Sequence, residues 1–371
     1  MKRVHRVLMA VTTAVAVLAA PTAALAVSGE PDRAGLQSGL DEITAESAVG
    51  ALMEVRDVDG VWRGTSGVSE LGTTRAVPAH GRFRMGSITK TFLATVTLQL
   101  VAKGRLHLDD KVGTWLPGVV PNGHRITVRQ LLDHTSGVPD YRRTLPMPPT
   151  PEFLDNRLRT WSAAELIQRA VANPPTVEPP DSGYAYSNTG YLLLGKIIEK
   201  ATGRPYGKEI ERRIIRPLRL RGTSVPGTFP RLRGPHPHGY VPVQRASGRH
   251  LVDFTVMNPS LFGAGGEMTS TTSDLNRFMA ALLDGRLVPG HLLDEMKTPG
   301  VKDGTYGLGL RWQDTACGVR VYGNDGDALA YQAWSFTTED RRRQVTIALT
   351  PDFRGDPDDA VDALLDKAFC D

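Results

Sequence analysis

Most signatures of metal-dependent or cofactor-dependent chemistry are missing from this sequence. It has no glycine-rich phosphate loop, no dinucleotide fingerprint, no Gly-x-Ser-x-Gly nucleophile elbow and no His-Glu-x-x-His zinc motif. His236 and His238 flank Pro237, but no third metal ligand accompanies this pair. We therefore expect an activity that needs no metal ion and no organic cofactor.

Charge of one sign is not gathered anywhere beyond the N-terminus. The 371 residues carry a formal charge of +4, but three positive charges lie within the first 26 residues, which contain no acid. The rest of the chain is therefore near +1, with Asp and Glu interspersed among the basic residues. Since no basic stripe marks a nucleic-acid-binding surface, we expect no nucleic-acid partner.

Long apolar runs are also lacking, except at the N-terminus. There a basic segment, an apolar run and a small-x-small site follow one another, which predicts a secretory signal peptide. We place it over residues 1–26, with cleavage after Ala26, and expect a secreted protein without stable membrane insertion. A membrane anchor is the alternative, but the run is short for a span and Pro21 interrupts it. The three features are Lys2, Arg3 and Arg6, then Val7 to about Ala20, then Ala24-Leu25-Ala26.

Cysteine is scarce, since Cys317 and Cys370 are the only two. An even number in an exported chain favours one disulfide, which would tie the C-terminal tail to the segment before Val319. Two free thiols are the alternative.

Hydrophobic periodicity predicts strands at both ends of the chain and helices between them. We therefore expect an α+β fold: an antiparallel sheet flanked by helices, from about 27–104 and 236–371, and a mostly helical lobe from about 105–235. A cleft between two such lobes is a common place for a site. Helices are expected at Leu36–Ser47, Ser87–Ala102, Val128–His134, Ser162–Ala172, Asn188–Thr202, Lys208–Ile215, Ser273–Leu283 and Asp358–Phe369. Strands are expected at Gly50–Val55, Val61–Val68, Tyr306–Trp312, Gly318–Tyr322, Tyr331–Thr337 and Gln344–Leu349.

The first candidate motif is the pair Ser87 and Lys90, at the start of a strongly apolar helical pattern. Residues i and i+3 share one face of a helix, so the hydroxyl and the amine can meet. Burial lowers the pKa of a lysine, and a neutral lysine can take the proton of a serine that attacks an acyl group. A capping serine with a solvated lysine is the alternative, but a helix N-terminus would also stabilise developing negative charge.

The second motif is Tyr186-Ser187-Asn188. If this segment is extended, the side chains of Tyr186 and Asn188 point the same way and reach one site together. The phenol could then relay a proton and the amide could hold a substrate carbonyl. The alternative is a tyrosine that only packs its ring, followed by an asparagine that caps a helix.

The third feature consists of two glycine-containing segments, residues 306–310 and 321–327. Glycines permit close approach of a ligand that lies along a strand edge. The alternative is a tight sheet with a turn.

Together these motifs resemble those of the penicillin-recognising serine hydrolases related to class C β-lactamases. Within that family the chain looks closest to the exocellular D-alanyl-D-alanine carboxypeptidase type of streptomycetes. The resemblance spans nearly the whole chain after the signal, and it implies the β-lactamase/DD-peptidase fold and a Cys317–Cys370 disulfide. It rests on Phe83-Arg84-Met85-Gly86-Ser87-Ile88-Thr89-Lys90-Thr91-Phe92, Gly104-Arg105-Leu106-His107-Leu108-Asp109, Ile126-Thr127-Val128-Arg129-Gln130-Leu131-Leu132-Asp133-His134-Thr135-Ser136-Gly137, Tyr184-Ala185-Tyr186-Ser187-Asn188-Thr189-Gly190-Tyr191 and Tyr306-Gly307-Leu308-Gly309-Leu310.

The resemblance also implies roles for individual residues. Ser87 would attack the substrate carbonyl and form an acyl-enzyme, with Lys90 and Tyr186 handling its proton. Asn188 would orient the substrate amide. The backbone N–H groups of Ser87 and Asp327 would form the oxyanion hole. His134 is expected to be structural.

The sequence departs from the family pattern at the third motif. The family usually has His-Thr-Gly or Lys-Thr-Gly, and here the residues are Asn324-Asp325-Gly326. In the carboxypeptidase type Arg311 would hold the terminal carboxylate of the substrate, near neutral hydroxyls. Asp325 and Asp327 replace those hydroxyls with anions, which should weaken the binding of a carboxylate.

We therefore expect an exported, monomeric serine hydrolase that acts through an acyl-serine intermediate. Its expected substrates are peptidoglycan-type D-amino-acid peptides, as in a D-alanyl-D-alanine carboxypeptidase. An esterase or a β-lactamase on the same scaffold is the alternative, and the altered third motif also allows a leaving side that is neutral or cationic. A non-catalytic protein that binds peptides or β-lactams is the alternative from another class.

Overall fold

The computed structural model describes residues 32–177 and 183–370. The signal peptide expected over residues 1–26 lies outside these described residues, as does part of the Pro-rich loop at 174–180. Within the described part, no helix is long and apolar enough to cross a membrane.

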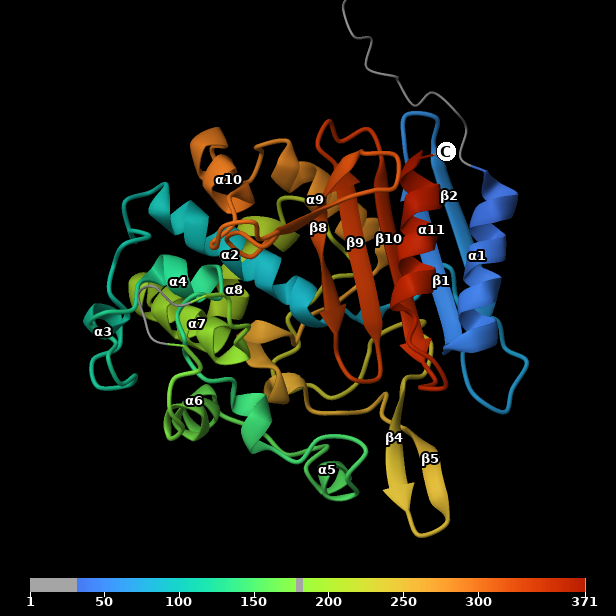
Figure 1. Ribbon diagram of the computed structural model, residues 1–371, viewed down its shortest axis with the longest axis horizontal. Helices are drawn as coiled ribbons and strands as arrows, with labels where there is room; N and C mark the ends of the chain where they lie inside the picture. The colour runs from blue at the N-terminus through green and yellow to red at the C-terminus, as the bar shows by residue number, and fades with distance from the viewer. Residues whose placement is uncertain (1–31, 178–182, 371) are drawn as a thin grey trace, which may run out of the picture.

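A six-stranded antiparallel sheet joins the two ends of the chain (Figure 1). Its order is β2-β1-β10-β9-β8-β7, so the first hairpin pairs with the last strand; for example, Leu52 lies opposite Ala348. This confirms the expected sheet built from both ends of the chain. The strands are β1 (Ala48–Arg56), β2 (Val61–Gly67), β7 (Arg311–Asp314), β8 (Arg320–Asp327), β9 (Gln332–Thr338) and β10 (Gln344–Pro351).

Helices cover both faces of this sheet. On one face, α1 (Arg33–Glu46) and α11 (Asp358–Cys370) pack against each other and against the strands (Figure 1). Leu40 and Phe369 belong to the apolar cluster between these two helices and the sheet. On the other face, α9 (Thr272–Leu283) packs on β1, β9 and β10. Strand β1 is buried along nearly its whole length because apolar layers cover both sides.

The middle of the chain is mostly helical and surrounds α2 (Thr89–Val101), whose side chains are nearly all buried. At two places the type of helix differs from that expected. Ser87 lies in a 3-10 turn, Gly86–Ile88, that precedes α2, and the helix expected at 208–215 continues from α8 as a π-helix. The other helices of this part are α3 (Val112–Trp115), α4 (Val128–Leu132), α5 (Glu152–Asp155), α6 (Ala163–Val171), α7 (Asn188–Thr202) and α8 (Tyr206–Ile210), followed by the π-helix Glu211–Ile215.

Two expectations about the third motif are wrong. The sequence predicts a strand over Tyr306–Trp312, but β7 begins only at Arg311. The segment before it is a tight turn, because the N–H of Gly307 donates to the carbonyl of Leu310 and Gly309 has a φ of +72°. Glycine adopts this left-handed conformation without a steric penalty. The next strand is longer than expected, since β8 continues through residues 323–327 by pairing with β9.

Several elements were not predicted from the sequence. The hairpin of β4 (Tyr240–Arg245) and β5 (Gly248–Asp253) projects away from the main sheet (Figure 1). Helix α10 (Gly290–Lys297) lies just before the third-motif turn. A short pair, β3 (Phe83–Arg84) with β6 (Thr269–Ser270), lies directly before the 3-10 turn of Ser87.

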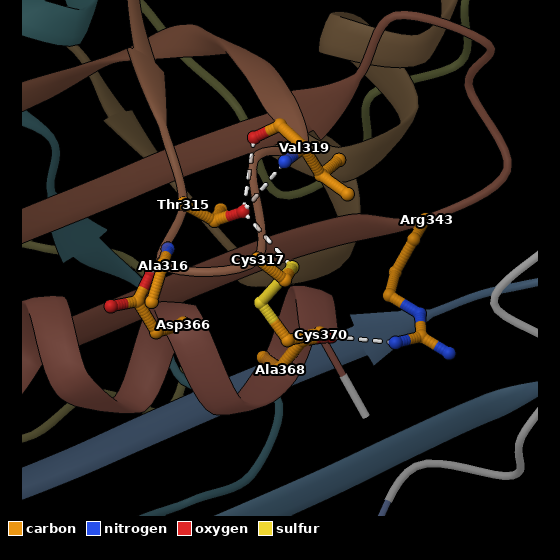
Figure 2. The surroundings of a disulfide bond; sticks show 8 residues. All are labelled: Thr315, Ala316, Cys317, Val319, Arg343, Asp366, Ala368 and Cys370. Atoms are coloured by element: carbon orange, nitrogen blue, oxygen red, sulfur yellow. Dashed lines mark hydrogen bonds between the residues drawn. A yellow bond between two sulfur atoms is a disulfide. The ribbon is translucent and has the colours of Figure 1, made fainter. Parts of the chain in front are cut away.

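The predicted disulfide between Cys317 and Cys370 is confirmed (Figure 2). The two Cα atoms are 5.8 Å apart, and the bond fastens the end of α11 to the turn between β7 and β8. Hydrogen bonds support the same junction: the guanidinium of Arg343 donates to the carbonyl of Ala368, and the N–H of Ala316 donates to Asp366. The C-terminal helix is therefore fixed to the sheet at its last turn.

Candidate active site

Ser87 is held at the junction of the sheet and the helical part. The N–H of Met85 donates to the carbonyl of Met268 (3.0 Å), which continues the β3–β6 pairing up to the turn of Ser87. Gly86 has a φ of +51°, and a Cβ there would lie 2.7 Å from backbone atoms of Asp327. Only glycine permits this left-handed turn and this close approach. The backbone of Ser87 thus lies beside the end of β8.

Lys90 lies one turn after Ser87 and is completely buried. Its ammonium nitrogen lies within hydrogen-bond distance of three oxygens: Ser87 Oγ at 3.0 Å, Asn188 Oδ1 at 2.8 Å and the carbonyl of Gly265 at 2.7 Å. Its pKa is lowered from 10.5 to about 7, mainly because burial disfavours the charged amine. Asp140 opposes this shift through its negative charge. The pair expected from the sequence therefore meets, and its lysine exchanges a proton near neutral pH.

Tyr186 reaches the same serine from the other side of the cleft. Its hydroxyl oxygen is 2.5 Å from Ser87 Oγ, and its ring lies over the Lys90 amine, 4.8 Å from ring centre to Nζ. Tyr186 as a whole residue is 38% exposed. Its partial burial raises the pKa of Tyr186 well above its usual range. The phenol therefore keeps its proton at neutral pH, in contrast to Lys90.

Asn188 begins α7 and is oriented at both ends of its amide. Its Oδ1 accepts from Lys90, and its Nδ2 donates to Asp140 Oδ2 at 2.7 Å. Ser187 is the N-cap of the helix, and its Oγ accepts from the N–H of Gly190. Residues 186–188 thus fulfil the expected geometry, with Tyr186 and Asn188 on one side and the serine between them turned to cap the helix.

His134 is an unforeseen neighbour of this segment. It has a φ of +62°, is buried, and accepts the N–H of Ser187 on Nδ1 at 3.2 Å. Its ring centre is 4.3 Å from that of Tyr186. Burial, and next the charge of Lys90, hold the pKa of His134 well below its usual value, so the imidazole is neutral. It supports the tyrosine from behind, in line with the structural role expected of it.

The end of β8 lies against the turn of Ser87. A Cβ on Gly326 would lie 2.1 Å from the carbonyl of Met85 and 2.8 Å from the nitrogen of Ser87. Asn324, on the same side of the strand, is buried, and its Nδ2 donates to Thr91 Oγ1 at 3.1 Å. The asparagine that replaces the usual His or Lys of the third motif therefore anchors the strand to α2.

The side chains of Asp325 and Asp327 alternate with these and face the cleft. Arg311 donates to Asp325 Oδ1 at 2.5 Å, and both residues are partly exposed. Asp327 Oδ1 accepts the N–H of Leu329 at 2.5 Å. The arginine expected to hold a substrate carboxylate is thus already paired with a carboxylate of the protein.

Two adjoining hollows form the cleft, and both are lined by Arg142, Tyr186 and Asp327. The first, about 490 Å³, also contains Asn188, and its walls include apolar side chains. The second, about 660 Å³, contains Ser87, Asp303 and the Arg311–Asp325 pair. We call them the asparagine hollow and the arginine hollow. The apolar wall residues of the asparagine hollow are Met147, Pro148, Pro149, Val241, Pro242, Leu329 and Phe353.

Comparison with known proteins identifies the family of this chain. Residues 17–369 match the family described as Beta-lactamase. The chain belongs to the β-lactamase family. Among solved structures, a D-stereospecific amidohydrolase from Streptomyces sp. superposes with a TM-score of 0.82 and 40% identity, over 92% of this chain and 99% of that chain. The chain is thus a serine hydrolase of this family with the β-lactamase fold, as the sequence motifs indicated.

Other members of the β-lactamase family are also similar. D-amino acid amidase from Ochrobactrum anthropi SV3 has a TM-score of 0.77 and 27% identity, over 90% of this chain and 97% of that chain. Penicillin-binding protein 4* of Bacillus subtilis is 28% identical over 79% of this chain. The chain spans about two thirds of the length of that last relative, 66%.

Two contributors to the site have no signal in the sequence. Asp140 accepts from Asn188, and the carbonyl of Gly265 accepts from Lys90, but neither residue belongs to a pattern that indicates catalysis. His236 and His238 lie outside the cleft; His238 contacts Asp253 at 2.7 Å. Among the described residues no group of three or more His, Cys, Asp or Glu side chains could hold a metal ion.

Proposed function

We propose that this protein is an amidohydrolase that forms an acyl-enzyme on Ser87 and cleaves amide bonds that follow a D-amino-acid residue. We further propose that the leaving side of its substrate carries no free carboxylate. Export is part of the proposal, and the Cys317–Cys370 disulfide supports it, since disulfides persist mainly outside the cytoplasm.

The contrast between Lys90 and Tyr186 supports the proton path. The lysine has a pKa near 7, so a large fraction is neutral at the pH of catalysis, whereas the tyrosine is protonated. We assign Lys90 as the base that accepts the Ser87 proton, and Tyr186 as the donor that passes a proton to the departing nitrogen. The 2.5 Å contact of the tyrosine with Ser87 and the 3.0 Å contact of the lysine fit such a relay.

The oxyanion hole would consist of the backbone N–H groups of Ser87 and Asp327. Gly86 and Gly326 support this assignment, because they allow the two backbones to approach within contact distance. Fixed N–H donors directed at the developing oxyanion are worth several kcal/mol of barrier in serine hydrolases, about 3–4 kcal/mol for one donor.

The Arg311–Asp325 ion pair supports the proposal that the leaving group of the substrate has no free carboxylate. In the carboxypeptidase type an arginine at this place holds the terminal carboxylate, but here Asp325 occupies its guanidinium at 2.5 Å. A substrate carboxylate would have to displace that contact and would then lie beside an unpaired Asp325. An amide or an amine product avoids this repulsion. The arginine hollow therefore suits an uncharged leaving group.

The asparagine hollow and the similar proteins support the proposal that the acyl group of the substrate is a D-amino-acid residue. The apolar wall of that hollow, which includes Leu329 and Phe353, would bury a large apolar side chain next to Asn188. Two of the similar solved structures are named as a D-stereospecific amidohydrolase and a D-amino acid amidase. We therefore expect D-phenylalanine amide to be a better substrate than D-alanine amide.

Hydrolysis of D-phenylalanine amide, L-phenylalanine amide and D-alanyl-D-alanine by the purified protein tests the proposal. We expect the D-amide to have the highest kcat/KM, by at least about tenfold over each of the others, which is about 1.4 kcal/mol of transition-state discrimination. The Ser87→Ala variant should lose the activity. Equal hydrolysis of the two enantiomers, or no hydrolysis of either amide, would contradict the proposal.

A D-alanyl-D-alanine carboxypeptidase is the second candidate. Arg311 lines the same hollow as Ser87, which supports a role in binding a terminal carboxylate. An Asp325→Thr variant separates the two. Freeing the guanidinium should raise kcat/KM for D-alanyl-D-alanine and leave the D-amide little changed. If wild type already prefers the dipeptide and Asp325→Thr lowers that activity, the carboxypeptidase assignment is the correct one.

A further inference from the structure

Asp327 lines the cleft and forms no ion pair with a basic side chain of the described residues, as is also true of Asp140 and Asp303. Asp325 is paired with Arg311, and Asp140 accepts from Asn188 and from the N–H of Arg142. Asp327 instead accepts a single backbone N–H, that of Leu329, on Oδ1. This bond fixes the orientation of the carboxylate and leaves Oδ2 for a ligand.

Asp327 lies near the place that the acyl group of the substrate would occupy. It lines both hollows, at the point where they meet beside Ser87 and Tyr186. Its backbone lies against Gly86, one residue before the nucleophile. The carbonyl carbon of any acyl-enzyme is bonded to Ser87 Oγ, so it must lie within a few ångströms of Asp327.

We propose that Asp327 binds the free α-ammonium group of the D-aminoacyl unit, so that the enzyme selects substrates with an unblocked amino terminus. This inference rests on the proposed function and deepens it. The α-nitrogen is attached to the carbon next to the reacting carbonyl, so it is carried to the same junction of the hollows. A charge-assisted hydrogen bond to the carboxylate would hold it there. An N-acetylated substrate offers no charge for this contact.

Other charged groups face the same place. Arg142 lines both hollows, and Arg143, Arg249 and Asp140 line the asparagine hollow. Without Asp327 these side chains would present an excess of positive charge to the acyl unit, which would repel an ammonium group. The carboxylate of Asp327 adds a negative charge at the junction of the two hollows, which would attract an ammonium group placed beside it.

The test compares D-phenylalanine amide with N-acetyl-D-phenylalanine amide in wild type, Asp327→Asn and Asp303→Asn. The asparagine keeps the backbone N–H of the oxyanion hole and nearly the same volume. Asp303 is the matched acid, since it lines only the arginine hollow. The quantity compared is the kcat/KM for D-phenylalanine amide divided by that for N-acetyl-D-phenylalanine amide. We expect Asp327→Asn to lower this ratio by about tenfold or more. Asp303→Asn should affect both substrates alike and leave the ratio near that of wild type.

The pH dependence of the preference for the free amine gives a second test, because it would not change if Asp327 had only a structural role. The preference of wild type for the free amine should fall as pH rises above the pKa of an α-amino group, about 8, because the ammonium then loses its charge. In Asp327→Asn this fall should be absent. Thermal unfolding of each variant checks that the fold is intact.

The possible failures are distinguishable. If wild type hydrolyses neither amide, both the proposed function and this inference are wrong. If wild type hydrolyses the D-amide but Asp327→Asn lowers both substrates equally, the amidohydrolase stands and the recognition of the ammonium by Asp327 is overturned. A ratio altered as strongly by Asp303→Asn would also overturn it.

Discussion

At the scale of single residues, burial divides the proton-transfer roles between two side chains that contact the same serine. Lys90 is enclosed among Ser87, Asn188 and Gly265, and burial favours its neutral form. Partial burial of Tyr186 favours its protonated form. One environment therefore produces a base and an acid at once, because desolvation always disfavours the charged state.

The first prediction concerns the pH dependence of acylation. The base must be neutral to accept a proton, and the folded pKa of Lys90 is about 7. We expect kcat/KM for an uncharged, N-acetylated substrate to rise about tenfold per pH unit below 7 and to level off above it. The Lys90→Met variant should lose activity at every pH. A limb that continues to rise toward pH 10 would show that the lysine is not desolvated as described.

The second prediction concerns Gly326. Its replacement by alanine places a Cβ against the carbonyl of Met85 and the nitrogen of Ser87, at 2.1 and 2.8 Å. Since both contacts are backbone atoms, the strand and the turn must separate. We expect Gly326→Ala to reduce kcat by about a hundredfold, the loss typical of one oxyanion donor. Wild-type kcat in this variant, measured on D-phenylalanine amide, would contradict the close packing.

At the scale of elements, hydrophobic periodicity predicts the helices and strands with a strong apolar pattern. It does not predict segments whose conformation depends on contacts with distant parts of the chain. Helix α7 begins and ends at the residues expected, because Ser187 caps it and Gly203 ends it in a left-handed conformation. The run Tyr306–Leu310 has the pattern of a strand but folds as a turn. Gly309 lies against Ala94 and Tyr191, and Gly307 lies against the backbone of Met296 and Thr298. No pattern within five residues contains that information.

The residues of the site also divide into those that the sequence predicts and those that only the structure shows. Ser87, Lys90, Tyr186 and Asn188 could be grouped from motifs and their resemblance to a family. Asp140 could not, because no motif contains it and it reaches Asn188 from a turn 48 residues earlier in the chain. The sequence alone does not establish the pairing of Arg311 with Asp325, since the register of β7 on β8 decides it.

The third prediction concerns Glu267, in the loop that supplies the Gly265 carbonyl to Lys90. Glu267 is buried, accepts from the hydroxyl of Tyr206, and has a pKa raised by burial from 4.5 to about 7. Its protonated form is favoured in the folded state, so its contribution is complete below pH 4.5 and is lost as pH rises through 7. We expect this group to cost up to about 3 kcal/mol of unfolding free energy between those limits.

Urea unfolding at several pH values measures this effect. Glu267→Gln should flatten the decline of stability between pH 4.5 and 7. Glu209→Gln is the control, because Glu209 is paired with Arg212 and Arg213 and its pKa is lowered, which gives the opposite sign. An unchanged decline in Glu267→Gln would show that another group is responsible.

At the scale of the whole molecule, the two ends of the chain build one sheet and its covering layer. Strands β1 and β10 pair, and α1 packs on α11. These contacts are non-local, whereas the Cys317–Cys370 disulfide closes a loop within the C-terminal part of the chain. The cleft lies between this sheet and the helical part, with β8 supplying one wall and Tyr186 with Asn188 the other.

The fourth prediction follows from that cross-link. Replacing Cys317 and Cys370 by serine opens a loop of 53 residues and should lower the free energy of unfolding by about 4 kcal/mol in the chain-entropy model. The disulfide lies on α11, away from Ser87, so kcat/KM at 25 °C should be retained. Denaturant unfolding with an activity assay checks both. Loss of activity without loss of stability would contradict the separation of the two sites.

We propose that the enzyme transfers a D-aminoacyl group to Ser87 of this cleft. Intact-mass spectrometry of the protein, quenched in acid during turnover of a D-phenylalanine ester and compared with the Ser87→Ala variant, tests this transfer. We expect a covalent D-phenylalanyl adduct on wild type, located to the peptide that contains Ser87, and none on the variant. Turnover that proceeds with no adduct at Ser87, or that persists in Ser87→Ala, would contradict it.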